Sequence, residues 1–270
     1  MQVSTNINAL ISSNALGKSN AAIADSVQRI STGQKLAKDD PSAIGMGARL
    51  KAQLGSLSAV NKGLNLGIGA LQQMDSSLTE VQNLLQNMYQ LAVSSSADDS
   101  VITTADRSAN SVAFLRYGAQ ITALAKMPKL GTTQLLSNTG TITMKVNDGT
   151  DSVTAATYDM TALTSLALPI AADAAAGTTA LAAVKVDQAT VASAQAAVGA
   201  NLESLTSQIS VNNSVMTGLT SAYSTVTSSD MASEVSKLAA AQIRQSSSSA
   251  MFAQSNQMGR EVAAYLLKGL

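Results

Sequence analysis

Carboxylates and hydroxyls are the side chains left to do chemistry in this chain, because its sequence contains no Cys, no His and no Trp. Those absences remove thiol and imidazole catalysis, Ser-His-Asp triads and the usual zinc and haem ligands. The glutamates are spread along the chain at Glu80, Glu203, Glu234 and Glu261. Since no Ser-Lys pair is singled out by its spacing either, the sequence predicts no enzyme and no cofactor.

Two short acidic stretches could hold a cation. The pair Asp39-Asp40 precedes Pro41, and Asn147-Asp148-Gly149 is followed by Asp151. A calcium loop needs a bidentate Glu at a set spacing, and none follows the second stretch. Carboxylates just before a helix are typical caps, and Asn-Asp-Gly is a strong turn signal. We therefore interpret the first stretch as a cap and the second as a turn, and expect no metal.

The charge balance argues against nucleic acid and membranes as partners. Lys plus Arg number 17, as do Asp plus Glu, so the chain has no large net field to hold it on an anionic surface. The sequence has no apolar run long enough to cross a bilayer. Its start also lacks a basic region followed by an apolar one. We expect no membrane insertion and, if the protein leaves the cell, no cleaved signal peptide of that kind.

Hydrophobic periodicity predicts the elements that carry these residues. Between Ile44 and Val93 apolar residues recur every three or four positions, which is a heptad pattern. One narrow stripe on so long a helix needs partner helices beside it. Hydrophobic residues make up 46% of the chain but aromatic ones only 3%, which favours close helix packing over a pocket-bearing fold. The seam positions are Leu50, Leu54, Leu57, Val60, Leu64, Ile68, Leu71, Met74, Leu78, Val81, Leu85, Met88 and Ala92.

Shorter elements surround this helix. We expect an earlier helix from Ser4 to Ile30, with Gly33 as the residue that stops it. A later helix is expected over 104–126, where the chain folds back after a Ser-rich turn. The apolar face of the later helix is predicted at Val112, Leu115, Ala119 and Leu124.

The middle of the chain has a different texture. Residues 141–146 alternate between apolar and polar, and a partner strand can return from Ser152, which predicts a hairpin. We interpret the Ala- and Thr-rich tract from Thr161 to Thr179 as a loop or small surface lobe.

A helix resumes near Ala180, and from Leu202 a second heptad seam begins that Asn212 interrupts. A buried Asn can fix the register of a coiled coil, or the helix is rotated and Asn212 touches solvent; the sequence leaves both open. Residues 228–230 offer a cap for a last helix, from Met231 to about Leu267. The predicted fold class is mainly α: a long antiparallel coiled-coil rod formed by both chain halves, with a small β-hairpin-containing middle region.

Two stretches near opposite chain ends resemble the signatures of bacterial flagellins. They are Gln28-Arg29-Ile30-Ser31-Thr32-Gly33 with Ala37-Lys38-Asp39-Asp40, and Asp230-Met231-Ala232-Ser233-Glu234-Val235 with Ala241-Gln242-Ile243 and Ala250-Met251-Phe252-Ala253-Gln254-Ser255-Asn256-Gln257. The resemblance covers roughly residues 1–130 and 185–270. Tyr89 and Gln90 depart from it, because many flagellins have Arg and Glu there. In those flagellins the arginine is part of the surface that the innate immune flagellin receptor reads.

The resemblance implies three regions. Residues 1–36 and 231–270 would form terminal helices of an inner filament tube, residues 37–130 and 180–230 a heptad rod in an outer tube, and residues 131–179 a small β-rich variable region. Assembly residues are expected at Ile7, Leu10, Ile23, Val27, Ile30, Val235, Leu238, Ile243, Met251, Phe252, Leu266 and Leu267. The rod seam is expected at Leu50, Leu54, Leu57, Leu64, Leu71, Leu78, Leu85, Leu205, Ile209, Met216 and Leu219.

The function implied by the resemblance is that of a structural subunit, not an enzyme. It would self-assemble into the extracellular filament of the bacterial flagellum, after export in an unfolded state and polymerisation at the distal tip, and would serve motility. The implied partners are further copies or sister flagellins, the flagellar export apparatus, an export chaperone, the filament cap and the hook-associated junction protein. A hook-filament junction protein of the same fold is the alternative, although the run Ala253-Gln254-Ser255-Asn256-Gln257 favours the filament subunit.

Overall fold

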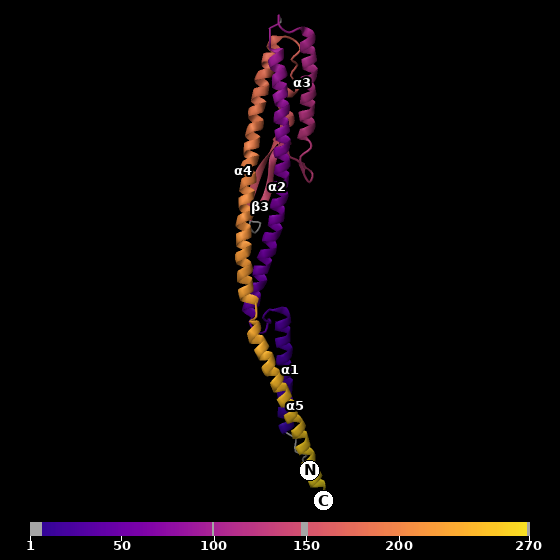
Figure 1. Cartoon of the computed structure of the whole chain (residues 1–270), viewed down its shortest axis with the longest axis vertical. Helices are drawn as coiled ribbons and strands as arrows, with labels where there is room; N and C mark the ends of the chain where they lie inside the picture. Colours follow the sequence, from indigo (N-terminus) through magenta and orange to yellow (C-terminus); the bar gives the residue numbers. More distant parts are fainter. Residues whose placement is uncertain (1–6, 99, 147–150, 269–270) are drawn as a thin grey trace. The chain divides into compact units, whose positions relative to one another are not determined.

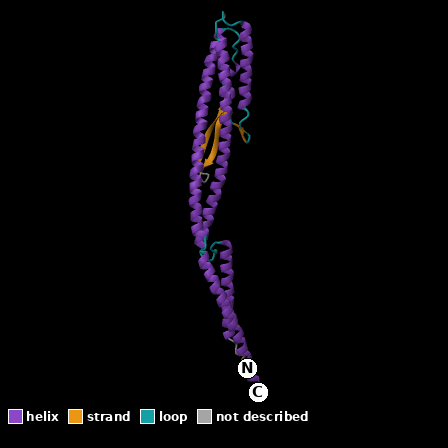
Figure 2. Cartoon of the chain, viewed as in Figure 1, coloured by secondary structure: helices purple, strands orange, loops and turns teal. Residues whose placement is uncertain are grey.

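The computed structural model describes residues 7–98, 100–146 and 151–268, with side chains in the last helix given as far as Glu261 and again at Ala264. Long helices account for most of these residues, and the strands are few and short (Figure 1 and Figure 2). The mainly helical fold with a small β-hairpin is therefore confirmed. The elements are α1 (Ile7–Thr32), α2 (Pro41–Ser95), α3 (Thr104–Ala125), β1 (Lys129–Leu130), β2 (Thr133–Gln134), β3 (Ser137–Val146), β4 (Asp151–Asp159), the 3-10 helices η1 (Met160–Ala162) and η2 (Thr164–Ala167), α4 (Ala174–Thr227) and α5 (Met231–Lys268).

The chain divides into two compact units. Unit 1 comprises Met1–Ala52 and Gly218–Leu270, and unit 2 comprises Gln53–Thr217. Both boundaries therefore fall inside the long helices α2 and α4. The predicted regions change instead at 36/37 and 230/231. Those regions refer to layers of a filament, so they stay a prediction.

Unit 2 is built on the antiparallel pairing of α2 with α4. Gln188 Nε2 donates to Gln86 Oε1 over 3.2 Å, and Gln195 Nε2 donates to Thr79 Oγ1 over 3.3 Å, so the two helices run past each other in opposite directions. Large side chains from the seam of α2 fill the space between the helices. Leu64, Met74, Leu78, Val81, Leu85 and Met88 are all fully buried.

Helix α3 is tied back onto the end of α2 by a buried arginine. Thr103 and Asp106 form a capping box that starts the helix. Arg107 is 2% exposed and donates from Nε to the Ser95 carbonyl over 3.1 Å and from Nη2 to the Ala97 carbonyl over 2.6 Å. The guanidinium thereby binds the last carbonyl of α2 and a carbonyl just after the helix, where the intrahelical partners have run out.

The predicted apolar face of α3 is largely wrong, although Leu124 is half-buried and packs against the core of unit 2. Val112 is 53% and Leu115 43% exposed, whereas Phe114 and Ile121 are fully buried. The reason is Gly118, because a Cβ built there would lie 2.6 Å from the Leu166 carbonyl oxygen. The chain of η2 passes over α3 at that glycine, and it selects the face that becomes buried.

The hairpin forms as predicted, with Thr143 opposite Thr154 in an antiparallel register. Its Asn147-Asp148-Gly149 turn lies outside the described residues. Met144 of β3 reaches α2 at Gly67, where a Cβ would lie 2.1 Å from the methionine sulfur. The absence of a side chain at Gly67 thus allows the hairpin to approach the helix closely.

The tract from Thr161 to Thr179 is not a surface lobe, which corrects the sequence-based interpretation. Leu163 and Ile170 are buried in the core of unit 2, and α4 already begins at Ala174. Asp187 of α4 holds this segment in place, because its carboxylate accepts hydrogen bonds from the Thr164 and Ser165 amides at 3.2 and 2.7 Å. A capping partner 22 residues away in sequence leaves no local signal.

Candidate assembly surfaces

In unit 1 the helices α1 and α5 pack through small side chains. Gln245 Nε2 of α5 donates to Asn20 Oδ1 of α1 over 2.8 Å, and Arg29 of α1 reaches Glu234 of α5, so the pair is antiparallel. The buried residues of α1 are three serines, Ser12, Ser19 and Ser26. The facing side of α5 presents Glu234, Ala241, Ser248 and Ser255, of which Ser248 is half-buried and the others are buried.

Both sets recur every seven residues, which is two helical turns, so each forms one stripe. The assembly residues predicted for the first helix are all large and apolar, and these serines are not among them. The seven-residue spacing of the serines was the signal that could have identified the stripe. Small side chains let the two backbones come close, and they leave the large apolar residues outside the contact.

The large apolar side chains of unit 1 are accordingly exposed. Six predicted assembly residues lie in solvent, namely Ile7, Leu10, Val27, Val235, Ile243 and Met251. The half-buried ones are Ile23, Ile30, Leu238 and Phe252. Leu266 and Leu267 lie outside the described side chains. Exposed fractions reach 66% at Ile7 and 68% at Ile243, so these faces of α1 and α5 have no partner within the described part of the chain.

An ion cluster joins the ends of these helices. Arg29 Nη2 lies 2.8 Å from Asp39 Oδ1, and its Nη1 lies 3.2 Å from Glu234 Oε2. Lys237 Nζ also approaches Glu234, at 2.7 Å. Glu234 therefore serves as an ion-pair partner, in addition to its predicted position in the first turn of α5.

The prediction that both Asp39 and Asp40 cap α2 is half wrong. Asp40 does so, because its Oδ1 accepts from the Ala43 amide over 2.9 Å. Asp39 instead accepts from the Leu36 amide and from Arg29. Gly33 ends α1 with φ +66, as its predicted role requires.

The cluster shifts the ionisation of its members. The hydrogen bond from Arg29 holds the pKa of the Asp39 carboxyl below its usual value, against a smaller opposing effect of burial. The hydrogen bond from Lys237, with further help from Arg29, lowers the pKa of Glu234 although burial acts in the other direction. Both carboxyls are thus held in the charged form.

The residues predicted for the rod seam differ in burial, and their role in a filament stays a prediction. Leu57, Leu64, Leu71, Leu78, Leu85 and Leu205 are buried, while Leu50, Leu54, Ile209, Met216 and Leu219 are half-buried. Asn212, whose position the sequence left open, is fully buried. Its Nδ2 donates to Asn61 Oδ1 over 3.0 Å, which places a polar layer between α2 and α4.

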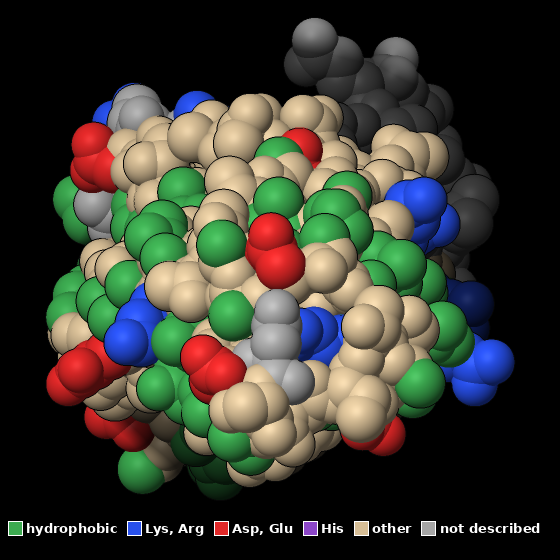
Figure 3. All heavy atoms as spheres, turned by 90° about the horizontal axis from the view of Figure 1, so that it is seen from above, with side chains coloured by type: hydrophobic (Ala, Val, Ile, Leu, Met, Phe, Trp, Pro, Cys, Tyr) green, Lys and Arg blue, Asp and Glu red, His purple; other side chains and the backbone are tan. Residues whose placement is uncertain are grey.

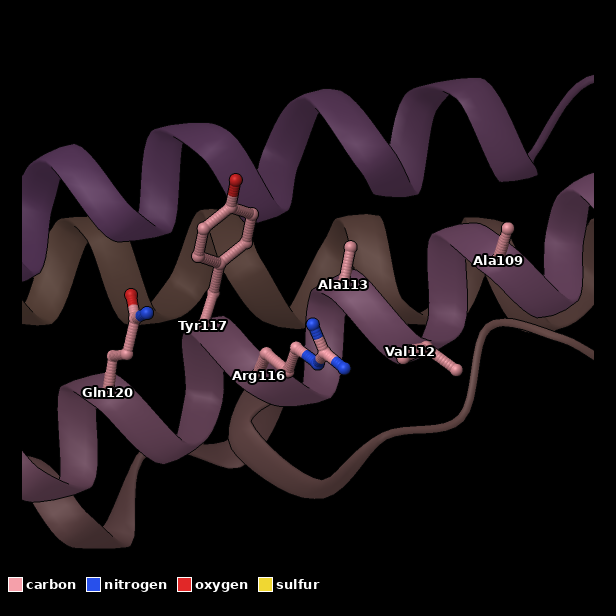
Figure 4. A pocket seen from close by; sticks show the side chains of 6 residues that line it. All are labelled: Ala109, Val112, Ala113, Arg116, Tyr117 and Gln120. Carbon is pink, nitrogen blue, oxygen red and sulfur yellow. The ribbon is translucent and has the colours of Figure 1, made fainter.

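Neither a metal-binding cluster nor a membrane-spanning helix is found among the described residues. No group of three or more acidic side chains there could hold a metal ion. No described helix is long and apolar enough to cross a membrane. A shallow hollow on α3 is lined by one helix alone, with Ala109, Val112, Ala113, Arg116, Tyr117 and Gln120 (Figure 4). Acidic, basic and hydrophobic side chains are interspersed on the face seen in Figure 3.

Comparisons with known proteins place both chain halves in one family. Residues 3–141 match the bacterial flagellin N-terminal helical region, and residues 181–266 match the bacterial flagellin C-terminal helical region. The flagellin of Listeria monocytogenes is 26% identical over 95% of this chain and 96% of its own length. The flagellin of Salmonella typhimurium is 27% identical over 54% of this chain and 30% of its own length.

A solved structure agrees in fold. The crystal structure of Bacillus cereus flagellin aligns with a TM-score of 0.51 and 18% identity, covering 56% of this chain and 88% of that one. At this identity the likeness concerns the fold alone.

Proposed function

Since the chain belongs to the bacterial flagellin family, and is therefore a structural subunit of the extracellular flagellar filament, we propose that it polymerises through the exposed apolar faces of α1 and α5. Contacts between different faces of identical subunits that do not close into a ring generate an open helical filament. Further copies of the chain, or sister flagellins, would supply the missing partner faces.

The single observation that supports this assignment is the packing of α1 on α5. The pair buries Ser12, Ser19 and Ser26 and leaves Ile7 and Ile243 in solvent. A helix pair that is complete by itself does the opposite, because each fully buried large apolar side chain contributes roughly 1.5–3 kcal/mol. Burial of these faces between subunits would supply the stabilisation that the isolated pair lacks.

The same packing fits a route of export and assembly. We propose that the chain is exported unfolded through the flagellar export apparatus with the help of an export chaperone. It then adds at the distal tip beneath the filament cap. The filament joins the hook through a hook-associated junction protein and serves motility. Because the α1–α5 contact buries small serines rather than large apolar side chains, we expect the terminal helices to open readily before export. They would order fully only when neighbouring subunits cover them.

Seeded polymerisation tests the proposal. Purified full-length protein is mixed with filament seeds beside a version lacking residues 1–30 and 231–270, and sedimentation and electron microscopy follow growth. Long filaments from the intact chain alone are expected. An intact chain that stays soluble but binds filament or hook ends in few copies would instead support the hook-filament junction role.

Two point variants locate the surface. Ile243 on α5 and Leu66 on α2 are equally exposed at 68%, so replacing either by Ser removes the same kind of side chain without opening the core. We expect Ile243→Ser to abolish or strongly slow elongation and Leu66→Ser to retain it. Equal loss in both variants would contradict the assignment of assembly to the terminal helices.

A further inference from the structure

We propose that Met251 and Met258 of α5 are oxidation sites, and that conversion of their thioethers to sulfoxides by peroxide weakens self-assembly. The inference rests on the proposed function, because it concerns a surface that assembly would bury. It assigns a redox sensitivity to a chain that has no Cys.

Methionine is the only sulfur-containing residue type in this sequence, which has 11 Met. Oxidation of a thioether follows its exposure to solvent. Met216 is half-buried, and its sulfur lies 3.6 Å from the Asn61 amide nitrogen. Met1 lies outside the described residues. Of the described methionines, the exposed ones are Met46, Met127, Met231, Met251 and Met258, and the buried ones are Met74, Met88, Met144 and Met160.

The two groups are distributed unevenly over the fold. All four buried methionines belong to unit 2, and four of the five exposed ones belong to unit 1. Met251 is 63% and Met258 56% exposed, and they are seven residues apart, so they lie on the same side of α5. A dilute oxidant therefore reaches this side of α5 without entering the core of unit 2.

The chemistry requires only a two-electron oxidant such as hydrogen peroxide. The sulfur lone pair attacks one peroxide oxygen and the O–O bond breaks. The leaving hydroxide then takes the proton from the oxygen now bound to sulfur, which gives water and the sulfoxide. Sulfur is oxidised to the sulfoxide and peroxide is reduced. The product carries a strong hydrogen-bond acceptor on a formerly apolar side chain. Burying it in a contact without a donor is unfavourable, and we expect the critical concentration for assembly to rise about tenfold.

The test uses full-length protein treated with hydrogen peroxide. Peptide mass spectrometry follows oxidation at each Met, and seeded sedimentation measures the critical concentration. We expect Met251 and Met258 to oxidise at least about tenfold faster than Met74 and Met88. They should be protected when the same treatment is applied to assembled filaments. Methionine sulfoxide reductases should restore assembly of the oxidised chain.

Matched double variants assign the effect. M251L/M258L keeps apolar side chains that cannot form sulfoxides, and M46L/M231L removes two other exposed sulfurs from unit 1. For each variant the critical concentration is compared before and after peroxide. It should not change on peroxide treatment in the first variant, whereas it should rise about tenfold in the second. Equal sensitivity of the two variants would overturn the inference. If M251L/M258L fails to assemble before oxidation, the natural sequence is used instead. Whether the reductases restore assembly of its oxidised form then shows whether sulfoxide formation weakens assembly.

The two proposals can fail separately. If the unoxidised chain does not elongate seeds, the proposed function fails and the assembly effect of oxidation falls with it. If unoxidised chains elongate seeds but Met251 oxidises no faster than Met74, or the oxidised chain assembles equally well, the inference fails and the proposed function stands.

Discussion

Asn212 of α4 donates a hydrogen bond from Nδ2 to Oδ1 of Asn61 on α2 over 3.0 Å, at a position with no solvent exposure for Asn212. Gln208 Nε2 donates to Asn212 Oδ1 over 3.1 Å, and Asn61 Nδ2 donates to Asn213 Oδ1 over 3.0 Å. These amides form a polar layer within an otherwise apolar seam. Such a layer opposes sliding of the two helices, because a shift leaves buried amides without partners.

Removing one amide from this layer should destabilise unit 2. For Asn212→Ala we expect a loss of about 1–3 kcal/mol in the free energy of unfolding, because the Asn61 oxygen loses its donor and Gln208 loses its acceptor. Urea denaturation followed by circular dichroism measures the loss. The double variant N61L/N212L, which replaces both partners by apolar groups, should recover most of it. Unchanged stability of Asn212→Ala would show that the layer contributes nothing.

Arg107 should contribute strongly to the stability of unit 2. In Arg107→Met the carbonyls of Ser95 and Ala97 lose their buried donor, and we expect a loss of about 2–4 kcal/mol. The control Arg116→Met changes an exposed arginine of the same helix and should stay within about 0.5 kcal/mol of the natural sequence. Urea denaturation distinguishes them, and equal midpoints would contradict the capping role of Arg107.

Two glycines inside helices should respond to alanine in opposite directions. Gly118→Ala places a Cβ 2.6 Å from a backbone oxygen of Leu166, so the packed segment must move, and we expect about 1–3 kcal/mol of destabilisation. Gly63 has nothing within 4 Å of the same position. Gly63→Ala should therefore stabilise the chain by up to about 1 kcal/mol through helix propensity alone. Thermal unfolding measures both, and a stabilising Gly118→Ala would contradict the close approach of η2 to α3.

Acid should weaken unit 1 through the Arg29 cluster. The pKa values of Asp39 and Glu234 are lowered in the folded chain, so as the pH falls the unfolded chain binds protons first. The stabilisation is therefore complete above the ordinary carboxyl pKa of about 4 and is lost as the pH falls through the lower folded values. Thermal unfolding between pH 6 and pH 3 measures the loss.

Arg29→Met removes the cation that pairs with both carboxylates and should make the pH dependence of stability shallower. Arg244→Met changes an exposed arginine of α5 that donates to the Ala240 carbonyl, so it should keep the natural slope. Asp98 and Asp106 in unit 2 also have a lowered pKa, but they are present in both variants and cancel in the comparison. Identical slopes for the two variants would remove the cluster from the acid response.

Much of the fold could be predicted because its elements depend on patterns of residues that are close together in the sequence. The heptads of α2, the Gly33 stop and the alternation of β3 each depend on neighbours within a few residues, where periodicity and capping chemistry are informative. The apolar residues of α1 and α5 that are candidates for assembly contacts could also be identified from the sequence. Their separation into exposed and half-buried positions was not, because a weak stripe on α1 fits more than one rotation of the helix.

Long-range contacts account for the predictions that failed. Val112 and Leu115 are as apolar as Phe114 and Ile121, so composition could not select the buried face of α3. Asp39 lies next to a residue that does cap α2, yet it pairs with Arg29, ten residues earlier in the chain. Asp187 orders a segment whose own Ala- and Thr-rich sequence resembles a loop.

The amino-acid sequence by itself determined the helices, the hairpin, the lack of thiol and imidazole chemistry and, through its two end signatures, the family. These depend on the order of residue types along the chain. Only the tertiary structure decided that Asn212 is buried, that serines rather than large apolar residues join α1 to α5, and that Arg29 bridges Asp39 and Glu234. Each of these depends on how one helix is rotated against another, and weak amphipathic stripes of Ser and Ala leave that rotation open until the partner helix is in place.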